Sequence, residues 1–297
     1  MKQLVILSGK GGTGKTTVAA ALAHLAAQDC RIVLADADVD AANLGLLLAP
    51  VTQETHDFIG GTIAVIDPAR CTGCGRCAEV CRFEAVHSEN ATPSETTCFV
   101  DPIACEGCAA CVYECPANAI AMQPQRAGQW FVAGTPHGPL YHAHLFAGQE
   151  NSGKLVTLVR RMAQLRAHDE HADLLLIDGP PGIGCPVIAA LSGADMALIV
   201  AEPTVAGAHD LKRVLSLAAH FRVPTTALIN KSDLSPAQSE EIITACAARN
   251  VPIVGRLPYD PEVMGSLVRR EPITMRESAI TATLQNVWAS LKMTLGY

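Results

Sequence analysis

The feature that most constrains the fold is a glycine-rich segment between an apolar run and an Ala-rich stretch. Residues 9–16 read GKGGTGKT and satisfy the pattern G-x-x-x-x-G-K-[ST]. They follow the apolar run QLVIL and open residues 15–28, where apolar side chains recur at helical spacing. Because a second apolar run, RIVLAD, comes next, the segment predicts a βαβ unit whose first turn binds phosphate.

Each position of this loop has a role in holding phosphate. Glycines let backbone N–H groups converge on phosphate oxygens at a helix N-terminus, while Lys15 supplies a charge for the β and γ phosphates and the Thr16 hydroxyl a ligand for Mg²⁺. An ordinary glycine-rich turn is disfavoured because motif and context coincide. The predicted nucleotide-binding residues of the loop are Gly9, Lys10, Gly11, Gly12, Thr13, Gly14, Lys15, Thr16 and Thr17.

Eight of the twelve cysteines form two copies of the pattern C-x2-C-x2-C-x3-C. Three thiolates at this spacing wrap one 4Fe-4S cube and the fourth points to the other cluster, as in bacterial two-cluster ferredoxins. Zinc is the alternative, but it prefers pairs of C-x2-C separated by a longer loop. Cluster one is predicted to take Cys71, Cys74, Cys77 and Cys115, and cluster two to take Cys105, Cys108, Cys111 and Cys81.

Apolar runs and helical patterns alternate again over residues 155–258, which predicts an α/β fold with a mainly parallel sheet and helices on both faces. Between them the chain is Cys-rich, with short segments and Pro and Gly punctuation. We therefore expect residues 1–59 and 124–297 to form a P-loop domain, and residues 60–123 an inserted small α+β domain of the bacterial ferredoxin type. No internal repeat is evident outside the paired Cys segments.

Composition narrows the classes of function. Aromatic residues make up 4%, so the core is predicted to consist mainly of aliphatic side chains, as in layered α/β folds. The net charge is −7 and the basic residues are scattered, so nucleic acid is not an expected partner. No stretch approaches the roughly 18 apolar residues of a membrane span, and the N-terminus lacks a signal-peptide cleavage pattern, which predicts a cytoplasmic protein. A stripe at helical spacing near the C-terminus is predicted to pack in the core: Leu284, Trp288, Leu291 and Leu295.

The form KGGTGKT resembles the deviant Walker A loop of the MinD, ParA and nitrogenase iron protein superfamily, and DGPPGIGCPVIAALSGAD resembles members that contain an inserted ferredoxin domain. The resemblance implies an ATPase whose Lys10 reaches across a nucleotide-dependent homodimer; a solvated lysine is the alternative. It implies that Asp38 orients and deprotonates the attacking water, with Asp36 structural. It further implies that Asp178, in a Walker B position, holds Mg²⁺.

Residues 230–233 read NKSD and follow an apolar run, where they could contact a nucleotide base. The letters fit a guanine-associated pattern, whereas the family resemblance implies adenine, so ATP is predicted. Asn230 is placed at the base, flanked by Pro258, Tyr259 and Asp260; a polar loop without this role is the alternative.

Two further groups are ambiguous in the sequence. Cys185 follows Asp178 at the offset where the nitrogenase iron protein carries a ligand of its bridging cluster. No cysteine lies between Cys115 and Cys185 to supply the second ligand, so a packed or redox-sensitive thiol is favoured. A polar surface strand is favoured over a metal site for the histidines His137, His142 and His144.

The predicted function is a dimeric switch that couples MgATP turnover to electron transfer through two 4Fe-4S clusters to an unidentified partner protein. One alternative is an ATPase that assembles or carries iron-sulfur clusters, and another is a redox-sensing regulatory or positioning ATPase. The predicted catalytic residues are Lys10, Lys15, Asp38 and Asp178, and the predicted Mg²⁺ ligands are Thr16, Asp38 and Asp178.

Overall fold

The structure is a computed structural model that describes residues 1–92, 95–149 and 152–296. The chain forms two compact units, each built from more than one segment. Unit 1 comprises residues 1–56, 130–144 and 152–297. Unit 2 comprises residues 57–129 and 145–151.

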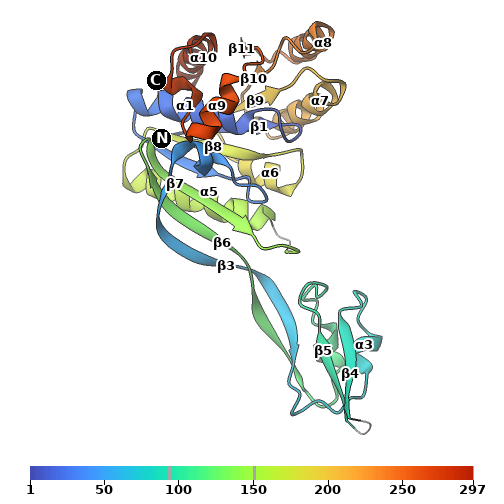
Figure 1. The fold of residues 1–297 in the computed structure, drawn as a ribbon. Helices are drawn as coiled ribbons and strands as arrows, with labels where there is room; N and C mark the ends of the chain where they lie inside the picture. Colours follow the sequence, from blue (N-terminus) through green and yellow to red (C-terminus); the bar gives the residue numbers. More distant parts are fainter. Residues whose placement is uncertain (93–94, 150–151, 297) are drawn as a thin grey trace. The chain divides into compact units, whose positions relative to one another are not determined.

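Unit 1 is built on a sheet with the strand order β11-β10-β9-β1-β8-β2-β7-β6-β3 (Figure 1). All neighbouring pairs from β11 to β7 are parallel, which confirms the predicted mainly parallel sheet. Its strands are β1 (Lys2–Ser8), β2 (Ile32–Asp36), β3 (Val51–Ile66), β6 (Ile120–Thr135), β7 (Gly138–Leu145), β8 (Leu174–Pro181), β9 (Met196–Ala201), β10 (Thr225–Ile229) and β11 (Ile253–Arg256).

Helices cover both faces of this sheet, as the sequence predicts (Figure 1). On one face α1, α2 and α10 pack over apolar side chains of β1, β2 and β8, and on the other α5 and α6 pack over β2 and β8. The helices are α1 (Lys15–Asp29), α2 (Leu44–Leu48), α5 (Ser152–Asp169), α6 (Cys185–Leu191), α7 (Val205–His220), α8 (Pro236–Ala247), α9 (Glu262–Arg269) and α10 (Ala279–Leu295), with the 3-10 turn η1 (Ile273–Met275).

The C-terminal helix α10 belongs to the core. Its stripe of Leu284, Trp288, Leu291 and Leu295 is buried against α1, which confirms the predicted packing role. The indole of Trp288 also donates a hydrogen bond of 2.7 Å to Asp29 at the end of α1. Among the residues that the structure describes, no helix is both long and apolar enough to cross a membrane.

Strands β3 and β6 are longer than any strand that the sequence predicted in this region. Each runs from unit 1 into unit 2, and β6 joins β7 through two residues, so these two strands run antiparallel. The sequence predicted only two short strands here, at WFVA and YHAHLF: the first falls within β6, and the second begins in β7 and extends one residue beyond it. The first half of β3, VTQETHD, is polar and mostly exposed, so it carries little apolar signal.

Unit 2 has a core of its own, in which cysteines alternate with aliphatic side chains. Strand β4 (Val86–Thr92) pairs antiparallel with β5 (Glu95–Val100), and the two short helices α3 (Arg76–Glu79) and α4 (Ala110–Glu114) pack on each other. Its most buried members are Ala64, Cys77, Val86, Cys98, Cys111 and Ile120.

Candidate functional site

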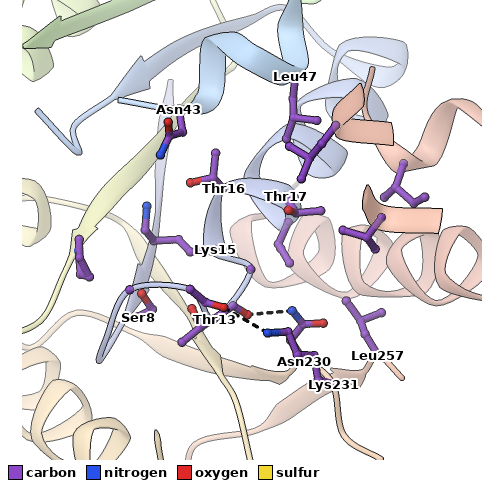
Figure 2. Close-up of a pocket in the computed structure, with 18 of the residues that line it drawn as sticks. Ser8, Thr13, Lys15, Thr16, Thr17, Asn43, Leu47, Asn230, Lys231 and Leu257 are labelled. Carbon is purple, nitrogen blue, oxygen red and sulfur yellow. Dashed lines mark hydrogen bonds between the residues drawn. The ribbon is translucent and has the colours of Figure 1, made fainter. Parts of the chain in front are cut away.

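The glycine-rich loop connects β1 to α1 and lines a cavity of about 800 Å³ at the carboxyl edge of the parallel strands. Parallel strands bring ligands to this edge, because the loops that follow them meet there. Figure 2 shows Thr16 and Thr17 at the start of α1 beside this cavity. Ten further predicted residues line it: Gly11, Gly12, Thr13, Gly14, Lys15, Asp38, Asn230, Pro258, Tyr259 and Asp260.

Lys15 is the buried cation of the site. Its ammonium lies 2.7 Å from Asp178 Oδ1 and 3.6 Å from Asp38 Oδ2, so the structure brings three predicted site residues together. Burial alone would lower the pKa of Lys15, but the carboxylates of Asp178, Asp36 and Asp38 raise it above its usual value. The lysine is therefore held in its charged form, which is the form that binds phosphate.

Asp178 and Thr13 leave polar atoms unused at the base of the loop. Asp178 is fully buried, and its Oδ2 has no hydrogen-bond partner among the described residues; the same holds for Thr13 Oγ1. A buried carboxylate oxygen without a partner is costly unless a ligand satisfies it. Carboxylate oxygens are ligands that Mg²⁺ prefers, and Asp178 contacts Lys15, which lines the cavity, so the unpartnered Oδ2 fits a hydrated Mg²⁺ bound to phosphate.

Asp36 supports the loop that carries Asp38. Its Oδ1 accepts a hydrogen bond from the backbone N–H of Asp38 at 3.1 Å, and its Oδ2 accepts one from the N–H of Leu44 at 2.9 Å. Burial, followed by the charge of Asp178, raises the pKa of Asp36 to about 7. Asp36 therefore orders the segment between β2 and α2, in agreement with its predicted structural role.

Burial also raises the pKa of Asp38, against the opposing effect of Lys15. A carboxylate with a raised pKa is a better proton acceptor, as a general base requires. Asp38 lines the cavity and its side chain is only partly buried, so water can reach it.

Glu202 is a site residue that sequence reasoning missed. One of its oxygens lies 2.8 Å from the ammonium of Lys10 and the other 2.7 Å from that of Lys231. Lys10 also donates a hydrogen bond of 3.1 Å to Thr204 Oγ1. Burial raises the pKa of Glu202, but its bonds to the two lysines lower it overall, so this carboxylate is ionised. Lys10 is thus bound within its own chain rather than freely solvated.

Asn230 and Lys231 hold the phosphate loop in place. The Asn230 amide donates a hydrogen bond of 2.7 Å to Thr13 O, and the Lys231 ammonium donates one of 3.3 Å to Gly12 O (Figure 2). Asn230 thus contacts the loop backbone as well as lining the cavity where a base is predicted. The backbone N–H of Tyr259, which also lines the cavity, donates a hydrogen bond of 2.7 Å to Asp233 Oδ1.

The predicted cluster ligands line two small cavities in unit 2, and each set combines both cysteine runs. The first cavity is bordered by Cys71, Cys74, Cys77 and Cys115, together with Cys98. The second is bordered by Cys105, Cys108, Cys111 and Cys81. Each set takes three cysteines from one run and one from the other, and Cys98, which lies outside both runs, also borders the first cavity.

Within residues 1–92, 95–149 and 152–296, no group of three or more His, Cys, Asp or Glu side chains lies close enough together to hold a metal ion.

The resemblance between the two halves of unit 2 extends beyond the cysteines, so the expectation of no wider repeat is wrong. Asp67 N binds Ala119 O at 2.8 Å, and at the same sequence offset Asp101 N binds Ala85 O at 2.7 Å. The N–H of Ala85 contacts Cys81 Sγ, and that of Ala119 contacts Cys115 Sγ. The repeated DP before each run, in DPARCTGC and DPIACEGC, is the sequence signal that could have revealed it.

The predicted histidine group is divided. His142 and His144 both stack on the ring of Phe131, with centroid distances of 4.9 and 5.4 Å, whereas His137 packs edge-on against His24. Cys185 is exposed at the first turn of α6.

Comparison with known proteins places the whole chain in context. Residues 4–273 match the family described as the CobQ/CobB/MinD/ParA nucleotide binding domain. An uncharacterised protein of Methanocaldococcus jannaschii is 29% identical over 293 residues, which cover 98% of this chain and 96% of that protein. A cytosolic Fe-S cluster assembly factor Nubp1 homolog of Drosophila grimshawi is 28% identical over 140 residues, covering 40% of this chain and 45% of that protein.

Solved structures share the fold. The MinD cell division protein of Aquifex aeolicus has a TM-score of 0.58 at 18% identity, covering 99% of this chain and 98% of its own. MinD of Pyrococcus horikoshii complexed with Mg-ADP has a TM-score of 0.59 at 16% identity, covering 99% of this chain and 97% of its own.

Proposed function

Because the chain belongs to the CobQ/CobB/MinD/ParA nucleotide-binding family, we propose that unit 1 hydrolyses MgATP as a nucleotide-dependent homodimer and that unit 2 carries two 4Fe-4S clusters coupled to that turnover. The observation that carries the proposal is the presence, in one chain, of a buried Lys15 between Asp38 and Asp178 and of two cysteine-lined cavities, the first bordered by five cysteines and the second by four. The solved relative with Mg-ADP supports the choice of nucleotide.

The loop residues bind the phosphates and prepare the attack. Backbone N–H groups of residues 9–14 and the Lys15 ammonium bind the β and γ phosphates, and Thr16 with Asp178 hold Mg²⁺. Asp38 orients a water molecule toward the γ-phosphorus and accepts its proton as the P–O bond to ADP breaks. The products are ADP and inorganic phosphate.

Lys10 couples hydrolysis to dimer formation. Glu202 binds it within its own chain at 2.8 Å, so Lys10 exchanges this carboxylate for the phosphates of the partner subunit when the dimer closes. The negative charge of the nucleotide supplies the competing ligand. Closure of the dimer thus depends on bound nucleotide. Hydrolysis reopens the dimer because the γ-phosphate leaves.

In unit 2 the eight cysteines of the two runs would hold the clusters, which would supply one-electron transfer when bound. Buried aliphatic side chains around the thiols exclude water from the sites. We expect electrons to pass to a partner protein that neither the motifs nor the fold identifies.

The proposal is tested by measuring two quantities on the anaerobically purified protein. Reduction potentials are titrated with and without MgATP, and ATP turnover is measured on oxidised and reduced protein. If the two units are coupled, MgATP binding must alter the reduction equilibrium of the clusters, and reduction must alter the binding of nucleotide. We therefore expect the reduction potentials to shift when MgATP is added. Lys15→Met is the control, in which the nucleotide no longer moves the potential. Reduction potentials that do not change with MgATP, together with an ATP turnover rate that does not change on reduction, would contradict the coupling.

A second function, the assembly or delivery of iron-sulfur clusters, is favoured by one observation. The Nubp1 homolog, named as a cytosolic Fe-S cluster assembly factor, matches part of this chain. ATP-dependent transfer of a cluster from this protein to an apo-ferredoxin would favour this function over electron transfer. A redox-sensing regulatory or positioning ATPase is the remaining alternative; it requires clusters that alter turnover without electron delivery.

A further inference from the structure

In unit 2 the first part of each cysteine run contains a glycine that packs closely against the backbone of a strand. Gly73 has φ +66° and lies so close to Thr96 O that a Cβ would be 2.3 Å from it. Gly107 has φ +65° and lies equally close to Thr62 O. The first loop therefore rests on β5 and the second on β3, and only glycine permits either approach.

The same sequence offset relates every part of this arrangement. The number of residues from Cys71 to Cys105 equals that from Thr62 to Thr96. Residues that border one cavity are separated by the same number from residues that border the other. Unit 2 is thus an internal duplication with equivalent positions around its two cavities.

At one equivalent pair the two cavities differ in chemistry. Two residues after Thr62, Ala64 borders the second cavity, and two residues after Thr96, Cys98 borders the first. Cys98 is 5% exposed and Ala64 is 2% exposed, and both belong to the core of the unit. The first cavity therefore has five cysteines around it, whereas the second has four and a methyl group.

We propose that the thiol of Cys98 donates a hydrogen bond to the sulfurs of cluster one and raises the reduction potential of that cluster above that of cluster two. This inference rests on the proposed function, because it requires both clusters. Four thiolates already complete the cube, so the fifth cysteine keeps its S–H and serves as a donor.

The physical effect has a definite sign. Reduction adds a negative charge to the cluster, and a hydrogen bond to its sulfurs stabilises the more negative state. Cluster two has Ala64 at the equivalent position and lacks this donor. Cluster one is therefore reduced before cluster two. The duplicated cysteine ligands alone would not create this difference in reduction potential between the two clusters.

Exchanging the two equivalent residues tests the proposal. In Cys98→Ala we expect one of the two potentials to move to a more negative value while the other stays unchanged. In Ala64→Cys we expect the other potential to rise. Cys98→Ser keeps a hydroxyl donor and is expected to shift less than Cys98→Ala. The potentials are measured by anaerobic redox titration followed by electron paramagnetic resonance.

Iron analysis separates the possible failures. All variants should retain about eight irons per chain, as expected for two cubes. If the unmodified protein lacks them, the proposed function fails as well. If it holds them and Cys98→Ala loses about half, Cys98 is a ligand and the tuning role is overturned. Unchanged potentials, or equal shifts of both, overturn it too. Cys30→Ala, in unit 1, is the matched control and should move neither potential.

Discussion

At the scale of single residues, the site depends on carboxylates whose charge is set by burial and by lysine partners. Asp178 and Asp38 face Lys15, Glu202 faces Lys10 and Lys231, and these contacts join segments far apart in the chain. Two single-residue predictions follow from this charge arrangement.

Replacing Glu202 by Gln should free Lys10. The variant loses the charge that binds Lys10 at 2.8 Å, and a hydrogen bond to a charged group contributes about 1.5 to 3 kcal/mol. We expect the ATP-dependent dimer to form at about tenfold lower protein concentration, measured by analytical ultracentrifugation. Lys231→Met controls for the second lysine on this carboxylate. A dimer that forms no more readily than in the unmodified protein argues against a restraining role of Glu202.

Asp36 should make stability depend on pH. Its pKa is raised from 3.8 to about 7 in the folded protein, so between these values the folded state binds more protons than the unfolded state. The free energy of unfolding should therefore fall as pH rises through this window, by at most about 1.4 kcal/mol per pH unit. Denaturant unfolding of the protein and of Asp36→Asn across pH 4 to 8 measures the effect, and equal slopes for the two proteins would exclude it.

At the scale of elements, Arg160 joins α5 to α6 and β1. This arginine is 7% exposed and donates to Ala189 O at 3.0 Å, to Ser192 O, and to Gln3 Oε1 at 2.8 Å. Two of these acceptors are carbonyls near the end of α6, which have few other partners at a helix C-terminus.

Arg160→Ala should lower the free energy of unfolding by about 2 to 4 kcal/mol, because it removes a buried guanidinium together with its hydrogen bonds to two carbonyls of α6 and its cap and to Gln3. Arg161→Ala is the matched control, since Arg161 is the exposed neighbour on the same helix and its loss should cost little. Urea denaturation of both variants gives the comparison. Similar losses in the two would mean that the contacts of Arg160 contribute nothing specific.

At the scale of the whole molecule, two units with separate cores should respond separately to their ligands. The core of unit 2 is small and contains cysteines, so we expect it to depend on bound metal, as small metal-binding domains do. Anaerobic calorimetry should show two transitions. Chelation of iron should lower mainly one, and MgADP at a hundredfold excess over its Kd should stabilise mainly the other by about 2.7 kcal/mol. Only one transition, moved equally by both treatments, would contradict this expectation.

The local motifs were readable from the chain because their chemistry depends on neighbours in sequence. The phosphate loop needs glycines, Lys15 and Thr16 at one turn between strand and helix, and a cysteine run needs only its spacing. The α/β class followed from alternating apolar and helical patterns, and these predictions of the fold are confirmed by the sheet of unit 1. The polar, exposed start of β3 carried no comparable signal.

What the tertiary structure decided are the contacts between distant segments. The ion pair of Glu202 with Lys10 depends on β9 lying beside β1, and the position of Cys98 at the first cysteine-lined cavity depends on β5 packing against the loop of Gly73. Spacing along the chain does not determine which strands become neighbours, because many arrangements of the sheet satisfy the same local patterns. Burial then sets the charges and hydrogen bonds of the residues that meet, and these are properties of the folded molecule alone.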